Sequence, residues 1–189
     1  LSGYLWKPEV DRICLSISSP RLEKPKRGKK SEPILSNLKE ALGAKFTRRV
    51  LQGQVAGVFD PLGLCTPITA GLKLDLHDLC LRKLDWDDKV PQELLDMWCN
   101  NMEDIQQLRE ISFQRAVIPQ DALDTNIHLI TAVDASSDIG VIAIYGRIKL
   151  KNEGYSCQLL LGRSKIVSGL TVPRAELKAA VIGAVSTDV

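Results

Sequence analysis

The sequence has few of the residues that build metal or redox centres, and few aromatic side chains. Its five cysteines are scattered without forming a Cys-x-x-Cys pair, and it has only two histidines, which argues against a zinc site. Aromatic residues make up 5% of the chain, so the core must be built mainly from aliphatic side chains. Isolated cysteines are typical of buried free thiols in a reducing compartment. We therefore expect an intracellular protein, cytoplasmic or nuclear, and not a secreted one.

The sequence also lacks long apolar runs and any strong imbalance of charge. No stretch approaches the ~18 apolar residues that a membrane span needs, and no secretory signal opens the chain, so we expect no membrane partner. The formal net charge is +2 over 189 residues, so a nucleic-acid-binding surface would have to be a local concentration of basic side chains. Leu1 already belongs to a strand-like pattern and Val189 follows a helical one. We therefore expect an internal fragment of a longer protein.

The first 33 residues predict a β-hairpin followed by a basic loop. Segments 3–6 and 13–17 have strand-like patterns on either side of a turn at Pro8, so the hairpin is expected over residues 1–18. Residues 19–33 are interrupted by three prolines and are made basic by a cluster of side chains: Lys24, Lys26, Arg27, Lys29 and Lys30. The loop is either a phosphate-contacting arm, because clustered lysines displace counterions from nucleic acid, or a solvated linker.

Residues 34–111 carry apolar side chains at the spacing of amphipathic helices and predict a helical module. We expect its helices over residues 33–42, 47–59, 66–82 and 91–108. Thr47 is the expected N-terminal cap of the second helix, and Thr66 followed by Pro67 opens the third. The second helix is expected to bury Leu51, Val55, Val58 and Phe59.

The pattern changes after residue 111, and a linker is expected over residues 112–125. Strands are then predicted over residues 127–133, 141–150 and 155–161, and residues 164–167 could continue the third strand past Gly162. A helix follows that opens at Pro173 and contains Leu177, Ala180, Val181 and Ala184. The predicted fold class is therefore α+β, with an N-terminal β-hairpin and a helical module followed by a β-β-β-α unit at residues 126–189.

Two acidic residues of this last unit are the candidates for chemistry. Asp134 ends an apolar strand, where a carboxylate is costly unless it is paired, hydrogen-bonded or bound to a cation; the alternative is an aspartate that caps the following turn. Glu176 lies in the first turn of the last helix, where the helix dipole alone would stabilise an acid. If that helix crosses the sheet, the two carboxylates could hold Mg²⁺ ions that clamp the attacking water and the leaving oxygen in phosphodiester hydrolysis.

Several blocks of the sequence, in a fixed order, resemble the BEL/Pao class of LTR retrotransposons and the region described there as the Pao retrotransposon peptidase family. The last block reads Val172-Pro173-Arg174-Ala175-Glu176-Leu177. The others are residues 47–51 with 58–67, 84–88 followed by Trp98, 134–136 and 162–167. Gln52 and Ala175 depart from the residues common at those positions, as does the placement of Gly140, but neither candidate acid is displaced.

The resemblance implies a layout and an activity. The hairpin would end the palm of a reverse transcriptase, the helices at 34–111 would form its thumb and connection, and residues 126–189 would begin a ribonuclease H domain. Asp134 and Glu176 match the first and second metal-binding acids of that domain, which cleaves the RNA strand of RNA–DNA hybrids with Mg²⁺. Arg48 and Arg49 would join the basic loop in contacting the template–primer. The partners would be the rest of the Pol polyprotein and the hybrid, in the nucleus or in a cytoplasmic virus-like particle.

The same comparison predicts an incomplete enzyme. No paired aspartates of a polymerase site precede the helices, and the strand that would carry a third ribonuclease acid is missing; Asp188 is too close along the helix to replace it. We therefore expect a truncated ribonuclease H-like unit that is inactive alone. Two alternatives stay open. One is a domesticated, non-enzymatic module that binds nucleic acid or protein. The other is an aspartic peptidase, disfavoured because Asp134-Ala135-Ser136 lacks the usual glycine and has no second copy.

Overall fold

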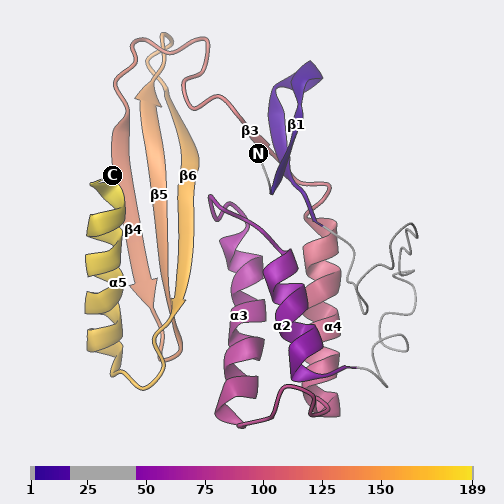
Figure 1. Cartoon of the computed structure of the whole chain (residues 1–189). Coiled ribbons are helices and arrows are strands. Elements are labelled where there is room, and N and C mark those ends of the chain that lie inside the picture. Colours follow the sequence, from indigo (N-terminus) through magenta and orange to yellow (C-terminus); the bar gives the residue numbers. More distant parts are fainter. Residues whose placement is uncertain (1–2, 18–45, 189) are drawn as a thin grey trace. The chain divides into compact units, whose positions relative to one another are not determined.

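The computed structural model describes residues 3–17 and 46–188 (Figure 1). The basic loop expected over residues 19–33 and the helix expected over residues 33–42 lie outside the described residues. The chain divides into two compact units. The first comprises Leu1–Leu5, Cys14–Phe59 and Pro67–Ser112; the second comprises Trp6–Ile13, Asp60–Thr66 and Phe113–Val189.

The first unit is built around three helices, shown in magenta to pink in Figure 1. They are α2 (Arg48–Gly57), α3 (Thr66–Leu81) and α4 (Gln92–Gln107). Helix α4 contributes the largest buried side chain, Trp98, whose ring centre lies 6.1 Å from that of Phe46. The bounds of α3 and α4 agree with the sequence prediction, because their apolar side chains recur at helical spacing.

Helix α2 buries a different face from the one that its apolar residues predict. Leu51 is fully buried as expected, but the second buried residue is Gln54, and Phe59 is 51% exposed. The reason is the indole of Trp98, whose Nε1 donates a hydrogen bond of 3.0 Å to Oε1 of Gln54. A buried indole N–H needs an acceptor, so a polar side chain occupies a core position.

A second buried polar contact joins α3 to α4. Nδ2 of Asn101 donates to Oδ2 of Asp75 at 2.7 Å, and Asp75 is only 4% exposed. Burial raises the pKa of the Asp75 carboxyl above its ordinary value, and the charge of Asp78 raises it further, while the Asn101 hydrogen bond partly offsets both effects. Asp75 is therefore an acid whose charged form the fold disfavours.

A small antiparallel sheet contains the expected hairpin and a third strand that the sequence did not predict. Strands β1 (Tyr4–Lys7) and β2 (Arg12–Leu15) flank the short helix η1 (Pro8–Val10), and β3 (Ser112–Gln114) pairs beside β2. The expected linker at 112–125 is thus wrong at its start. A strand of three residues carries too little periodicity to be recognised, and its pairing to β2 spans about 100 residues of sequence.

The larger sheet, in the second unit, has the order β4-β5-β6 and is antiparallel throughout. Its strands are β4 (His128–Ala135), β5 (Ile139–Lys149) and β6 (Tyr155–Ile166), with one register shift at Ile144/Tyr145. Helix α5 (Val172–Thr187) then runs back along one face of this sheet (Figure 1). The strand–strand–strand–helix order agrees with the sequence prediction.

Helix α5 packs on the sheet through its smallest side chains. Ala175, Ala179 and Gly183, four residues apart, are its buried residues, whereas Leu177 is 66% exposed. A Cβ atom on Gly183 would come within 2.6 Å of Val133 and 3.3 Å of Thr131. The helix therefore lies close to β4 at this point. Within the described residues, no helix has the length and apolar character of a membrane span.

Candidate functional site

Asp134, the first candidate acid, stands at the end of β4 beside a tight turn. It is exposed, and its Oδ1 accepts a hydrogen bond of 2.8 Å from the backbone N–H of Ala135. The turn itself is organised by Ser136, whose Oγ accepts from the N–H groups of Asp138 and Ile139 at 3.3 and 3.2 Å. The side chain of Asp134 therefore bonds its neighbouring amide, while Ser136 does most of the turn capping.

The pleat of β4 places Asp134 on the face of the sheet away from α5. Val133 and Ala135 face the helix, because the Cβ positions of Gly183 and Gly140 lie against them, and Gly140 also lies against Ala179. Successive side chains of a strand point to opposite faces. The Cβ of Asp134 therefore points away from α5.

Glu176 lies just after the first turn of α5, which contains no acid, because the helix begins at Val172 and not at Pro173 as expected. It is at the end of the sheet that carries Asp134. The helix runs antiparallel to β4, since Ala179 lies by Gly140 while Thr187 forms a 2.7 Å hydrogen bond with Thr131 further along the strand. Glu176 precedes Thr187 by about three helical turns, so both lie on the β4 side of α5. The two acids thus lie at the same end and the same edge of the sheet. They are on different faces, however, because the side chain of Asp134 points away from α5 and Glu176 belongs to α5. A common cation position stays a prediction.

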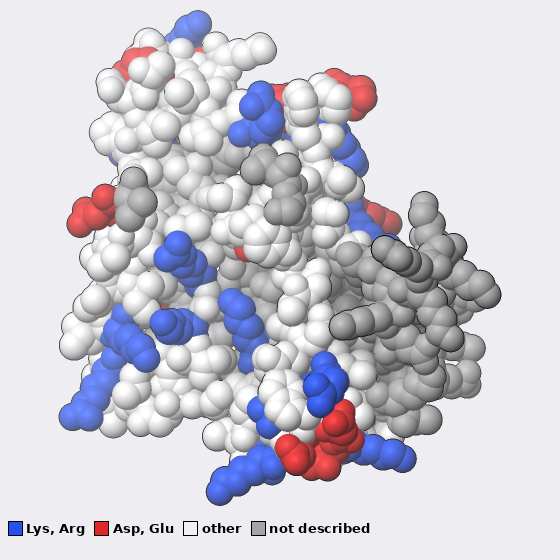
Figure 2. Space-filling model, in the orientation of Figure 1, with Lys and Arg blue, Asp and Glu red and all other residues white. Residues whose placement is uncertain are grey.

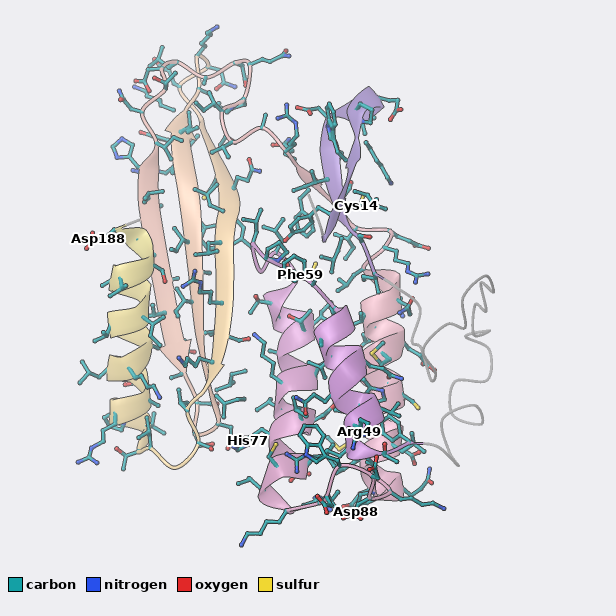
Figure 3. The ribbon with its side chains drawn as sticks, viewed as in Figure 1. Cys14, Arg49, Phe59, His77, Asp88 and Asp188 are labelled. Atoms are coloured by element: carbon teal, nitrogen blue, oxygen red, sulfur yellow. The ribbon has the colours of Figure 1, made fainter. Side chains whose placement is uncertain are left out.

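The donor set for a divalent metal is incomplete in the described parts of the chain. No group of three or more His, Cys, Asp or Glu side chains within residues 3–17 and 46–188 is arranged to hold a metal ion. Asp188 follows the last turn of α5 and is labelled in Figure 3; it lies about 18 Å along the helix from Glu176 at ~1.5 Å per residue. Because Mg²⁺ prefers six oxygen ligands, these residues do not fit a complete Mg²⁺ site.

The two basic residues proposed from the sequence, Arg48 and Arg49, bind a loop of their own unit. Nη1 of Arg48 donates to the carbonyl oxygen of Leu84 at 2.6 Å, and Arg49 pairs with both carboxylate oxygens of Asp87 at 2.9 and 3.0 Å. Both guanidinium groups lie 5.0–5.5 Å from the Trp86 ring. The hydrogen bond from Arg49 lowers the pKa of the Asp87 carboxyl.

These contacts give the two arginines at the start of α2 a local structural role, in which they fix the 84–88 loop against the helix. Figure 3 shows Arg49 and Asp88 at the same end of the helical unit. Oγ of Thr47 caps α2 by accepting from the N–H of Val50 at 3.4 Å, as predicted. Contact of Arg48 and Arg49 with nucleic acid stays a prediction, as does that of the lysines and Arg27 in the undescribed loop.

Sequence reasoning missed a group of exposed basic residues on β6 and α5. They are Arg163, Lys165, Arg174 and Lys178. Two signals could have found them: the alternate spacing of Arg163 and Lys165 on one strand, and the four-residue spacing of Arg174 and Lys178 on one helix. Only the register of the sheet and the orientation of α5 show that the two pairs lie on the same side.

Three antiparallel strands are followed by a helix on one face of the sheet, with one acid near the end of the first strand and another near the start of the helix. This arrangement is consistent with a ribonuclease H-like fold. The comparison with family models agrees. The family described as the Pao retrotransposon-like RNaseH-like domain matches residues 47–188. The chain therefore belongs to this family. No curated protein matches the chain.

Proposed function

We propose that this chain contributes part of the ribonuclease H activity of a Pao-type retrotransposon polyprotein, in which Asp134 and Glu176 serve the hydrolysis of the RNA strand of an RNA–DNA hybrid. The observation that carries the proposal is the position of the two acids. One lies near the end of β4 and the other near the start of α5, and both are at the same end and edge of the β4-β5-β6 sheet. Membership of the RNaseH-like family supports it.

The role of each acid follows from its surroundings. Both carboxylates are exposed, so each can accept a hydrogen bond or a cation without the cost of desolvating a buried charge. The bond from Ala135 holds one oxygen of Asp134 and leaves the other lone pairs available. Mg²⁺ in a complete ribonuclease H site supplies the charge that activates water and stabilises the leaving oxygen. Two carboxylates provide only part of its ligands, so we expect this chain alone to leave a hybrid uncut.

The assignment of the acids can be tested without catalysis. Mn²⁺ titrated into isotope-labelled protein should broaden the backbone NMR signals near residues 134 and 176 before those elsewhere, because a paramagnetic ion relaxes nearby nuclei. Asp134→Asn and Glu176→Gln should each reduce the broadening at both positions, whereas Asp138→Asn should not. Broadening confined to one of the acids, or none below millimolar Mn²⁺, would mean that the two do not share a cation.

Activity is tested with a hybrid whose RNA strand is labelled. We expect no cleavage in Mg²⁺ by the chain alone. Cleavage that disappears in Asp134→Asn would show that the expectation of inactivity is wrong while supporting the assignment of the acid. Cleavage that survives both substitutions would refute the assignment.

The same proposal extends to the elements before β4. The β1–β2 hairpin would correspond to the end of a polymerase palm, and helices α2 to α4 to its thumb and connection. A non-enzymatic module that binds nucleic acid is the second candidate. It is favoured by the basic residues on β6 and α5, which need no metal to act, and would be supported by hybrid binding without Mn²⁺-induced broadening at either acid.

A further inference from the structure

A row of residues along α5 faces β6 and ends in two exposed basic side chains. Arg174, Lys178, Ile182 and Ser186 are spaced by four, so they form one inclined row on the helix surface. The row is fixed on the β6 side, because Nη1 of Arg163 on β6 donates to Oγ of Ser186 at 3.2 Å. Ile182 and Ser186 are half-buried, and the row then comes out to solvent at the two basic residues.

Strand β6 adds two basic side chains on the same side. Arg163 and Lys165 pair with Ile142 and Gly140 of β5, and both of these residues face α5 through Gly183 and Ala179. Directly paired residues of neighbouring strands point to the same face. Arg163 and Lys165 therefore emerge beside the helix, and both are exposed. Figure 2 shows lysine and arginine side chains gathering over the lower part of this unit.

The acidic residues of α5 point elsewhere. Glu176 lies about 160° around the helix from Arg174 and from Lys178, on the β4 side, at ~100° per residue. Asp188 follows the far end of the helix. Two acids of the sheet lie at this end, Asp134 and Asp138. Asp134 points to the face away from α5, and Oδ2 of Asp138, in the turn between β4 and β5, accepts from Oγ of Ser137 at 2.7 Å. The four basic residues therefore form a strip of one sign.

We propose that this strip, composed of Arg163, Lys165, Arg174 and Lys178, binds the sugar–phosphate backbone of nucleic acid without reading its sequence. It deepens the proposed function in one respect only, by naming a surface that would hold the substrate. The strip runs from strand β6 to helix α5. Along the helix axis Arg174 and Lys178 are ~6 Å apart, which is close to the axial length of two nucleotides of one strand at ~3.4 Å each. Exposed Lys and Arg side chains neutralise phosphates and release counterions.

A protein partner fits the strip less well. The core of a protein–protein interface is apolar and depleted of charge. The strip itself consists of four charged side chains, although the exposed aliphatic residues Val181 and Val185 lie beside it on α5. The sugar–phosphate backbone matches such a surface better than a folded protein does, because its negative charges repeat at a fixed spacing. The strip has no fixed network of polar groups that could read the bases, so the binding is expected to be independent of sequence.

The test is a charge-neutralised variant, Lys165→Gln/Lys178→Gln, which retains the Arg163–Ser186 hydrogen bond. The matched control is Lys149→Gln/Lys151→Gln, which removes the same charge from exposed positions near the β5–β6 turn of the same unit. Binding is measured by fluorescence anisotropy with a labelled RNA–DNA hybrid, duplex DNA and single-stranded RNA over a series of salt concentrations. Circular dichroism melts show whether each variant is folded.

We expect the strip variant to weaken hybrid binding about tenfold at low salt and to make the slope of log K against log salt shallower by about 2, since each phosphate contact contributes about 0.9. Lys165→Arg/Lys178→Arg should retain the affinity, and the control should change it less than twofold. Equal effects of strip and control, or no binding of any of the three probes at low salt, would overturn the inference. The Mn²⁺ experiment on Asp134 and Glu176 uses no nucleic acid, so it reports on the proposed function separately.

Discussion

Gly63 and Gly162 touch backbone to backbone. A Cβ atom on either residue would overlap the carbonyl oxygen of the other, and the N–H of Gly162 donates to the carbonyl oxygen of Leu62 at 2.8 Å. Gly63 also has a φ of +66°, which disfavours any other residue. This contact holds the loop of residues 60–66 against β6 within the second unit. It depends on the absence of two side chains, 99 residues apart in sequence.

The first prediction concerns this contact. Gly162→Ala should lower the free energy of unfolding by about 1–3 kcal/mol, the usual cost of forcing an extra methyl group into a close-packed site. The backbone atoms that the methyl group would meet cannot turn aside as a flexible side chain would. Urea denaturation monitored by circular dichroism gives the change.

Gly53→Ala is the matched control for this substitution. A Cβ on Gly53 meets nothing within 4 Å in the interior of α2, so alanine should be neutral or stabilising by up to about 1 kcal/mol through its helix propensity. A Gly162→Ala variant that is as stable as the parent would mean that the loop is not held against β6.

The second prediction concerns pH. The raised pKa of Asp75 means that the folded chain keeps this proton to a higher pH than the unfolded chain does. Its contribution to stability is therefore lost as pH rises through the interval above the ordinary value of 3.8. Asp75→Asn should raise the free energy of unfolding at pH 7 by roughly 1 kcal/mol, a typical size for one substitution, and the gain should vanish near pH 4.

Asp104→Asn provides the comparison for Asp75→Asn, because Asp104 is an exposed acid on α4. It should leave the pH dependence of unfolding nearly unchanged. If Asp75→Asn is instead less stable than the parent at pH 7, the ionised carboxylate and its bond from Asn101 must stabilise the fold, and burial is not the dominant effect.

The third prediction separates the five free thiols. Cys14, Cys65 and Cys99 are buried, whereas Cys80 and Cys157 are exposed. Burial, with a smaller effect of Asp60, raises the pKa of the Cys65 thiol to about 12. A disulfide reagent at pH 8 should therefore modify two thiols rapidly, since the thiolate is the reacting form, and should modify Cys65 only as fast as the protein unfolds.

Cys80→Ser and Cys157→Ser should each remove one rapid equivalent, and all five thiols should react in concentrated urea. Raising the pH from 8 to 9 should not add a third rapidly reacting thiol, because the pKa of Cys65 is raised to about 12. Rapid labelling of Cys65 in the folded protein, identified by peptide mass analysis, would contradict its burial.

The fourth prediction concerns the hydrogen bond between Gln54 and Trp98. Gln54→Leu should lower the free energy of unfolding by about 1–3 kcal/mol, because the buried indole N–H loses its acceptor. A double-mutant cycle with Trp98→Phe should give a coupling energy above about 0.5 kcal/mol. Gln52→Leu, at an exposed position of the same helix, should have little effect, and additivity within the cycle would argue against the bond.

The elements that the sequence predicts best are those whose own side chains repeat regularly. Helices α3 and α4 and strands β4 to β6 fall where their periodicity places them. Strand β3 and the burial of Gln54 could not be predicted in this way, because each is determined by a partner far away in the chain. For β3 it is the hairpin, and for Gln54 the indole of Trp98.

The candidate site divides in the same manner. The position of Asp134 near a strand end follows from local patterns, and the structure has it there. Glu176 was expected in a first helical turn, but α5 begins one residue earlier than Pro173 and the acid lies just beyond that turn. The placement of the Asp134 side chain relative to that of Glu176 depends on which face of β4 packs against α5 and on how α5 is rotated about its axis. Residues close in sequence to either acid do not determine these. The basic strip was missed for the same reason, since no short window contains both of its halves.

The close packing of α5 on β4 has a consequence for evolution as well as for stability. Because Gly183 abuts Val133, even one added methyl group there must lift or roll the helix, and a roll would swing an acid on one flank and lysine and arginine on the other in the same motion. Selection that acts on Glu176 or on the basic strip would thus also constrain Gly183, which belongs to neither. A substitution at Gly183 would disturb the position of the acid and the position of the basic side chains together.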